Sequence, residues 1–351
     1  MQSRTAASTR AIPLFVSSLL VAAGALYAAA PARAAQEPPS VAARVTPVVG
    51  GLDHPWAMAF LPDGGVLITE RPGNLRLLRT PGGLSKPLSG VPKVAASGQG
   101  GLLDVALSPD FATDRYVYLS YAESDGDKSG TAVGRGRLSE DATGLQDFKV
   151  LFRQAPKLSS GLHFGSRLVF DGKGYLFISL GENNQRPTAQ DLDKLQGKVV
   201  RLKADGSVPP DNPFAGKAGA RPEIWSYGHR NPQGMALNPW SGDLWENEHG
   251  PRGGDEINLI QPGKNYGWPL ATYGINYSGQ PIPEAKGETA PGTEQPLFWW
   301  AKSPAISGMA FYNADRFPAW QKSVFIGVGQ SEPDSPDAGW QSGSGAGMVA
   351  G

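Results

Sequence analysis

Apolar and polar residues alternate in short runs along most of this chain, and turns rich in Pro, Asp and Gly separate the runs. Such alternation is typical of β-strands with one buried face. One unit, a turn next to an alternating apolar hairpin, returns five times. The copies begin at Trp56, Leu102, Gly165, Pro232 and Ile306.

The spacing of these copies indicates the architecture. Aligning them makes five apolar positions equivalent, separated by 47, 63, 67 and 74 residues: Phe60, Leu107, Phe170, Leu237 and Phe311. Each interval has room for a four-stranded antiparallel blade and a variable loop. Weaker strands are predicted in the outer parts of the blades, at 74–78, 149–152, 198–202 and 256–260. The pattern predicts an all-β fold, a β-propeller, with a β-sandwich as the alternative.

Long loops are predicted between the strands, at 122–134, 183–195, 207–223 and 272–295. In a propeller such loops gather at the mouths of the central channel, so that residues distant in sequence can meet on one ligand.

The amino terminus has a different pattern. Arg4 and Arg10 flank the start of an apolar run over 12–30, and Ala32-Arg33-Ala34 follows it. This is the form of a secretory signal peptide with a small-residue cleavage site. We expect residues 1–34 to direct export to the periplasm, with an uncleaved membrane anchor as the alternative.

Composition narrows the class of partner. The formal net charge is zero and no long basic run occurs, so neither a nucleic-acid surface nor stable membrane insertion is indicated. The chain has no cysteine, which excludes disulfides and thiolate chemistry. A small-molecule partner is favoured.

His163 is the strongest candidate for proton transfer. It stands just before a strong strand, and Glu182 lies at the far end of the same hairpin. An imidazole oriented by a carboxylate can act as a general base. A structural, hydrogen-bonded histidine is the alternative.

Three further segments offer binding groups. Arg230 and Asn231 place a guanidinium beside an amide, which suits the oxygens of an anionic or quinonoid ligand. Gly250-Pro251, followed by Asp255-Glu256, forms an oxygen-rich loop suited to a hard cation such as Ca²⁺. Gln99 lies among glycines that allow its amide to project into a cavity.

Taken together, the segments GQGGLLDVALSPDF, HFGSRLVFDGKGYLFISLGE, YGHRNPQGMALNP and EHGPRGGDEINLIQPGKNYGWP resemble the soluble glucose and aldose sugar dehydrogenases that depend on pyrroloquinoline quinone (PQQ). The resemblance covers roughly residues 45–325. It implies a six-bladed propeller with PQQ at the channel mouth, held partly by Ca²⁺. It also implies oxidation of an aldose at C1 to the lactone, with electrons passing to an artificial or respiratory acceptor.

The resemblance also implies roles for individual residues. His163 would take the proton of the C1 hydroxyl as hydride passes to the quinone, and Glu182, an Asp in the glucose dehydrogenases, would orient it. Gln99, Arg230 and Asn231 would line the cofactor pocket, with Arg230 polarising the quinone. The carbonyls of Gly250 and Pro251 would bind the cofactor-bridging Ca²⁺. Glu256 and the Tyr266 backbone would lie at a second Ca²⁺ site.

The sequence departs from the family after the fifth repeat. Residues 35–328 are predicted to form the propeller domain, and 329–351 a Gly/Ser-rich disordered tail where a complete sixth blade is expected. A frameshift or truncation would explain this, and we expect such a chain to be poorly stable and to bind PQQ weakly. Two alternative functions remain: a non-catalytic exported binding module and a Ca²⁺-dependent sugar lactonase.

Overall fold

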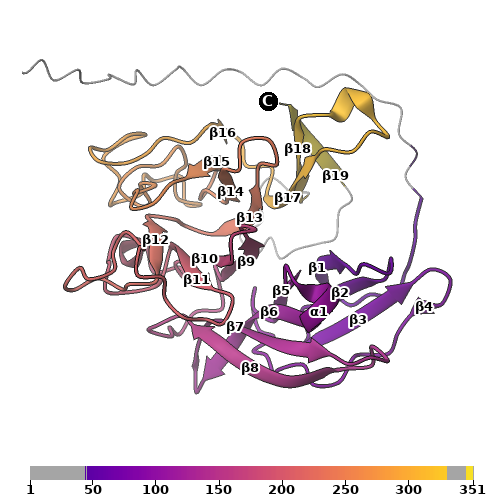
Figure 1. Ribbon diagram of the computed structural model, residues 1–351. Helices are drawn as coiled ribbons and strands as arrows, with labels where there is room; N and C mark the ends of the chain where they lie inside the picture. Colours follow the sequence, from indigo (N-terminus) through magenta and orange to yellow (C-terminus); the bar gives the residue numbers. More distant parts are fainter. Residues whose placement is uncertain (1–43, 45, 330–344, 351) are drawn as a thin grey trace, which may run out of the picture. The chain divides into compact units, whose positions relative to one another are not determined.

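In the computed structural model, residues 44, 46–329 and 345–350 are described, the last six by their backbone alone. The predicted signal peptide therefore lies outside the described residues. None of the described helices is long and apolar enough to cross a membrane. The fold is built almost entirely of antiparallel strands in five successive sheets (Figure 1).

Four of the sheets have four strands each, joined in sequence order. The first contains β1 (Pro55–Phe60), β2 (Val66–Glu70), β3 (Asn74–Arg79) and β4 (Gly83–Leu84). The second contains β5 (Leu102–Leu107), β6 (Tyr116–Asp125), β7 (Lys128–Leu138) and β8 (Leu145–Arg153). The third contains β9 (Gly165–Phe170), β10 (Tyr175–Leu180), β11 (Lys198–Lys203) and β12 (Ile224–Tyr227). The fourth contains β13 (Pro232–Leu237), β14 (Leu244–Glu248), β15 (Asp255–Ile260) and β16 (Phe298–Trp300).

The fifth sheet has three strands, β17 (Ile306–Tyr312), β18 (Ser323–Val328) and β19 (Gly345–Ala350). β19 pairs with β18 along its whole length. The structure thus differs from the expectation of a disordered tail over 345–350, while 330–344 lie outside the described residues. Three short helical turns complete the elements: α1 (Phe111–Asp114), η1 (Arg186–Ala189) and η2 (Pro318–Trp320).

The core lies between the sheets, which makes them propeller blades. The first strand of each sheet packs against the first strand of the next, in the series β1, β5, β9, β13 and β17. One apolar cluster fills each interface. Leu67 and Val105 meet between the first two blades, Val133 and Leu168 between the next two. The later interfaces are filled in the same way. A sandwich would instead bury one core between two facing sheets, so the propeller prediction is confirmed.

The repeat positions also agree with the structure. Phe60, Leu107, Phe170 and Leu237 each end the first strand of their blade, and Phe311 is next to last in β17. The four weaker strands lie within β3, β8, β11 and β15.

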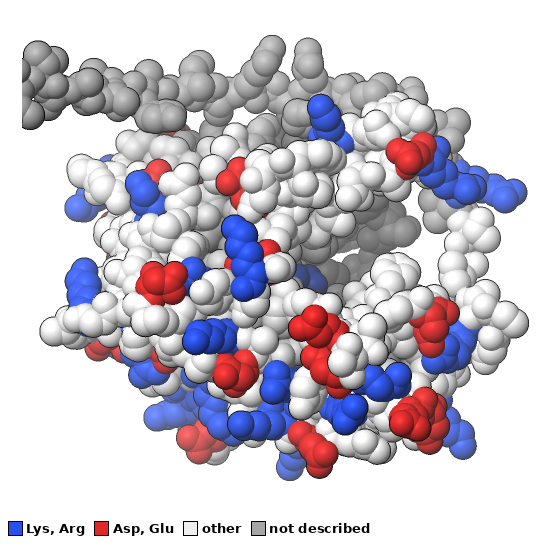
Figure 2. Space-filling model, in the orientation of Figure 1, with Lys and Arg blue, Asp and Glu red and all other residues white. Residues whose placement is uncertain are grey.

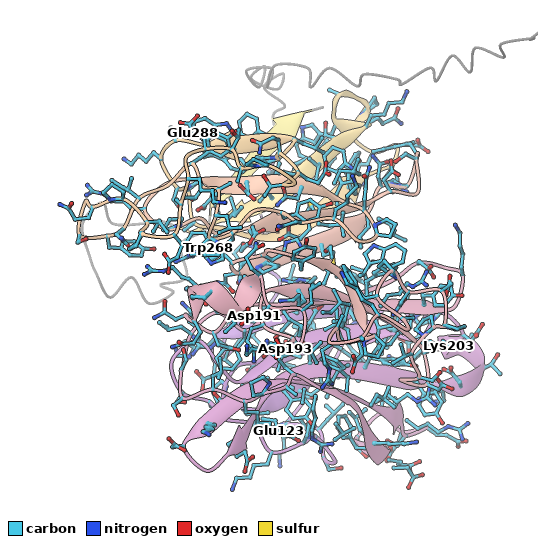
Figure 3. The ribbon with its side chains drawn as sticks, turned by 90° about the vertical axis from the view of Figure 1, so that its left-hand side faces the viewer. Glu123, Asp191, Asp193, Lys203, Trp268 and Glu288 are labelled. Atoms are coloured by element: carbon cyan, nitrogen blue, oxygen red, sulfur yellow. The ribbon has the colours of Figure 1, made fainter. Side chains whose placement is uncertain are left out.

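The predicted loop over 122–134 is wrong. β6 and β7 continue through it as a hairpin that closes at the pair Asp125 and Lys128. The small polar residues there suggested a loop, but the hairpin is held by tertiary contacts. Glu123, labelled in Figure 3, accepts hydrogen bonds from Arg153 Nε at 2.8 Å and Lys157 Nζ at 2.6 Å. The other three predicted loops contain no strand.

Candidate active site

His163 stands two residues before β9, with its backbone in the left-handed region at φ +51°. A non-glycine residue there is strained, and such strain is concentrated at functional sites. Two glycines allow the tight approach of β9 to the end of β10. A Cβ on Gly181 would lie 2.0 Å from the His163 carbonyl oxygen, and one on Gly165 would lie 2.7 Å from the Gly181 nitrogen.

The His163 ring is held by one nitrogen. Its Nδ1 lies 3.0 Å from Oε1 of Glu182, which is fully buried. The second carboxylate oxygen of Glu182 accepts a hydrogen bond from the Gln185 backbone at 2.7 Å. No described residue hydrogen-bonds His163 Nε2, so the carboxylate fixes the ring and leaves the other nitrogen for a ligand.

The surroundings keep the imidazole neutral. Burial lowers the pKa of His163, and the nearby Arg230 cation lowers it further, while Glu182 raises it. A neutral imidazole whose Nδ1 faces a carboxylate presents an unprotonated Nε2, which is the form a general base requires.

Gln99 reaches His163 from the loop before β5. Its Oε1 accepts a hydrogen bond from the His163 backbone N–H at 2.8 Å. Beside it, Arg71 donates to the carbonyls of Gly98 and Gly100, so that a cation borders the Gln99 loop. Arg71 has no distinguishing signal in the sequence, because an arginine after a strand is common and only the packing of the blades brings it to this site.

Arg230 and Asn231 precede β13, on the blade next to that of His163. The Arg230 carbonyl accepts the Glu182 N–H at 3.0 Å, which joins the two blades at the site. The Arg230 guanidinium carbon lies 5.4 Å from the centre of the Trp268 ring. Its Nε is buried with no partner among the described residues. A buried, partly unpaired guanidinium is costly without an anion, so this group is ready for an acidic ligand.

Glu248 was also missed. It ends β14, and its Oε2 accepts hydrogen bonds from the backbone N–H groups of Arg230 and Asn231. Its Oε1 lies 3.1 Å from His229 Nδ1. Glu248 thereby holds the segment that presents Arg230 and Asn231. Its only sequence signal is its place at the end of an apolar strand.

The loop after β14 carries the predicted carbonyl ligands. The Gly250 N–H donates to Asp255 Oδ1 at 3.0 Å, which closes the loop. Among the described residues, none donates a hydrogen bond to the carbonyl of Gly250 or of Pro251. Two free carbonyls on a rigid loop suit a hard cation.

A second group of oxygen ligands lies between β14 and β15. Asn258 Nδ2 donates to Glu256 at 3.0 Å and to Glu246 at 3.2 Å, with Glu248 at 3.4 Å. His229, Glu246 and Glu248 each offer a ligand atom within 4.8 Å of the others. Burial raises the pKa of Glu246 and Glu256 well above the usual range, and the Glu248 carboxylate adds to this.

Tyr266 joins this group through a ring. It stacks on His229 with ring centres 4.8 Å apart. Of the two predicted residues, Tyr266 therefore contacts His229, and Glu256 is the cross-strand partner of Glu248.

A cavity opens beside His163, between the first strands of the blades. Its lining includes the predicted Gln99 and Asn231 and several residues that the sequence did not single out: Trp56, Arg71, Leu103, Phe164, Gly165, Gln233 and His249. Inner-strand residues were read as core, because the sequence does not show which of them face the channel. The face of the molecule shown in Figure 2 carries Lys and Arg interspersed with Asp and Glu.

Known proteins share both the sequence and the fold of this chain. The family model for glucose/sorbosone dehydrogenases matches residues 52–332. The chain belongs to this family. The family resemblance predicted from the sequence is confirmed, and with it the prediction of an enzyme of the sugar dehydrogenase type.

Relatives within the family are similar over most of the chain. The aldose sugar dehydrogenase YliI of Escherichia coli is 70% identical over 279 residues, which cover 79% of this chain and 75% of the relative. The crystal structure of the soluble aldose sugar dehydrogenase from Escherichia coli, in its apo form, superposes with a TM-score of 0.78, covering 79% of this chain and 80% of the other. The PQQ-bound aldose sugar dehydrogenase of Streptomyces coelicolor is 31% identical, with a TM-score of 0.68, covering 86% of this chain and 83% of the other.

Proposed function

We propose that this protein oxidises aldose sugars at C1 to the lactone, with PQQ as the bound oxidant and His163 as the general base. The observation that carries the proposal is the His163 and Glu182 pair, which fixes one ring nitrogen and leaves Nε2 without a hydrogen-bond partner among the described residues. A relative 31% identical to this chain has been solved with PQQ.

The residues present fit the cofactor. PQQ carries several carboxylates and quinone oxygens, which need donors and cations. Asn231, which lines the cavity, and the neighbouring Arg230, with its buried unpaired Nε, supply such donors. Gly250 and Pro251 offer carbonyls to a Ca²⁺ ion, and Gln99 borders the same space. When bound, PQQ supplies a two-electron oxidant that accepts hydride.

The chain's own residues perform the proton chemistry. Nε2 of His163 accepts the proton of the C1 hydroxyl while hydride leaves C1 for the cofactor, so that C1 and its oxygen become a carbonyl. Glu182 stabilises the imidazolium that results, since a buried carboxylate at 3.0 Å favours the charged ring. Arg230 stabilises negative charge that develops on the oxidant.

A second Ca²⁺ site is proposed at Glu256 and the Tyr266 backbone, with Glu246 and Glu248 contributing carboxylates. Glu246 and Glu248 are buried and Glu256 is partly buried, and carboxylates this close repel one another when no cation lies among them. A divalent ion would neutralise them and stabilise the blade.

The remaining parts of the proposal concern the whole protein. The five sheets are five blades of a six-bladed ring, formed by a domain over 35–328 that follows a signal peptide over 1–34. β19 (Gly345–Ala350) adds a strand to the fifth blade from beyond that domain. The protein acts in the periplasm and passes its electrons to a respiratory acceptor, for which an artificial dye can substitute.

The test is reconstitution of the purified protein with PQQ and Ca²⁺, followed by glucose or another aldose and a dye acceptor. We expect sugar-dependent dye reduction that His163→Ala abolishes while PQQ absorbance still reports binding. Binding of PQQ without turnover on any aldose would contradict the catalytic proposal and favour a binding module. Lactone hydrolysis without PQQ would favour the lactonase.

A further inference from the structure

Arg167 lies where the first strands of all five described blades meet. It belongs to β9, and its guanidinium carbon lies 4.3 Å from the centre of the Trp56 ring of β1. Nη1 donates to Asp104 Oδ1 of β5 at 2.8 Å. Nε and Nη2 donate to the Gln233 carbonyl of β13 at 3.1 and 2.9 Å. A Cβ on Gly308 of β17 would lie 3.6 Å from Nη2.

This side chain is next to the cavity although it does not line it. Trp56 and Gln233, two of its neighbours, are lining residues. Asp104 is 4% exposed, and its second oxygen accepts the Leu168 N–H at 2.7 Å. The guanidinium is thus fixed by a buried carboxylate on one side, a backbone carbonyl on another and an aromatic face on a third. A planar fork with fixed donors suits this task better than a single ammonium group.

A chain of hydrogen bonds leads from Arg167 to the proposed cofactor-binding amide. Gln233, whose carbonyl Arg167 holds, donates from its Nε2 to Asn231 Oδ1 at 3.0 Å. The same Oδ1 accepts the Gly165 N–H at 3.3 Å. These two donors fix the orientation of the Asn231 amide. A flip of the amide would place its NH₂ group against both donors, which is unfavourable. Nδ2 has no acceptor in the described part of the chain and is left for the cavity.

We propose that Arg167 is a positioning residue: by clamping Gln233 it orients the Asn231 amide so that its N–H groups face the ligand in the cavity. The inference rests on the proposed function for the identity of that ligand. Arg167 itself does not contact the ligand in this proposal. Its physical basis is that Arg167 holds strands of separate blades in one arrangement, and the amide orientation follows from that arrangement.

The most informative variant is Arg167→Lys. It keeps a cation for Asp104, which would otherwise be a buried unpaired charge, and removes the two-donor grip on the Gln233 carbonyl. The matched control is Arg115→Lys. Arg115 also donates from Nε and Nη2 to backbone carbonyls, those of Leu138 and Ser139 at 2.8 and 2.7 Å, and it does not line the cavity.

The first readout is binding of PQQ in the presence of Ca²⁺, followed by absorbance titration, with the melting temperature of each unliganded variant measured alongside. We expect Arg167→Lys to weaken PQQ binding by about tenfold relative to the wild type, as the loss of one well-aligned hydrogen bond from a buried donor predicts. Arg115→Lys should bind as the wild type does, with a similar fall in melting temperature. Equal affinities in the two variants would refute the positioning role and leave Arg167 a structural residue.

The second readout needs no cofactor. Crystal structures of the unliganded wild type and Arg167→Lys should show the Asn231 amide rotated in the variant alone, together with a displaced Gln233. An Asn231 amide unchanged in the variant would overturn the inference. This comparison decides the question even when the wild type binds no PQQ, a result that would count against the proposed function and not against the role of Arg167.

Discussion

Two histidine–glutamate pairs occupy equivalent places in neighbouring blades. His163 precedes β9 and meets Glu182 through Nδ1 at 3.0 Å, and His229 precedes β13 and meets Glu248 through Nδ1 at 3.1 Å. In both pairs the carboxylate follows the histidine by 19 residues. Glu248 ends β14, and Glu182 lies two residues after β10. The repeated blade thus builds the same pair twice.

The pairs differ at the other ring nitrogen. His229 Nε2 lies 2.8 Å from Ser226 Oγ, and its ring is stacked on Tyr266 and fully buried. His163 Nε2 has no protein partner among the described residues, and the neighbouring Gln99 and Phe164 line the cavity. A carboxylate-oriented histidine is therefore not in itself a base. It becomes available for catalysis where the neighbouring blades leave its second nitrogen without a partner.

The largest effects should follow replacement of each of the two histidines in turn. His163→Asn should lower turnover by about 10²- to 10⁴-fold, the range of a lost general base, with the fold retained. His229→Asn should instead destabilise the protein by about 1–3 kcal/mol, because Ser226 and Glu248 lose a buried partner. Steady-state rates and urea unfolding of both variants measure this. Similar losses of turnover in the two variants, after correction for the amount of folded protein, would show that the two histidines do not differ in function.

Replacing Glu182 and replacing Glu248 should also have different effects, one on turnover and the other on stability. Glu182→Gln should reduce turnover by about ten- to a hundredfold, because a neutral amide stabilises imidazolium less well. Glu248→Gln should act mainly on stability, since Glu248 accepts the N–H groups of Arg230 and Asn231. The split between turnover and unfolding free energy is the measurement. A Glu248→Gln protein of normal stability would show that these contacts matter less than their geometry indicates.

Calcium should stabilise the part of the protein around His229 and Glu248. The carboxylates of Glu246, Glu248 and Glu256 adjoin that pair, so we expect Ca²⁺ to raise the melting temperature and a chelator to lower it. Glu256→Gln should reduce the calcium-dependent part of this shift, whereas His163→Asn should preserve it. A shift that is the same in Glu256→Gln and the wild type would place the stabilising ion elsewhere.

The pH dependence should report His163. Because burial and Arg230 lower its pKa, the acid limb of kcat/KM should fall below the ordinary histidine value of about 6.5. Glu182 raises that pKa, so Glu182→Gln should move the limb still lower. The lowered pKa of His163 also sets the direction in which stability changes with pH. The His163 contribution is fully present above the unfolded pKa of about 6.5 and diminishes as the pH falls toward the lower folded value. An acid limb above pH 7 would contradict this.

The smallest effect should come from Ser226→Ala. It frees His229 Nε2 from its hydroxyl partner at a cost of about 1 kcal/mol in stability. Turnover should stay unchanged, since the ring remains buried under Tyr266. The double variant Ser226→Ala, His163→Asn tests which contact keeps His229 inactive. Any turnover above that of His163→Asn alone would show that the Ser226 hydrogen bond matters more than burial of the His229 ring.

Much of the site could be predicted from local sequence. His163, Glu182, Arg230 and Asn231 stand at strand ends, where propeller loops converge, and the structure brings them together. Glu248, Arg71, Gln233 and Arg167 could not be found in this way. They lie on or next to strands whose alternation indicates burial, and an alternating pattern does not show whether the inward position meets a core or a channel.

The sequence by itself determined the repeated alternating hairpin, its count of five, the propeller class and the order of the polar strand ends, because these depend on residues close together along the chain. It misjudged 122–134, where contacts from Arg153 and Lys157 hold a strand pair in a segment of loop-like composition. Only the tertiary structure decided which of two similar histidines is open. That choice depends on Ser226 and Tyr266 closing over one ring and on the first strands of the blades leaving a cavity beside the other. Such contacts join separate segments and arise only when the blades pack around the channel.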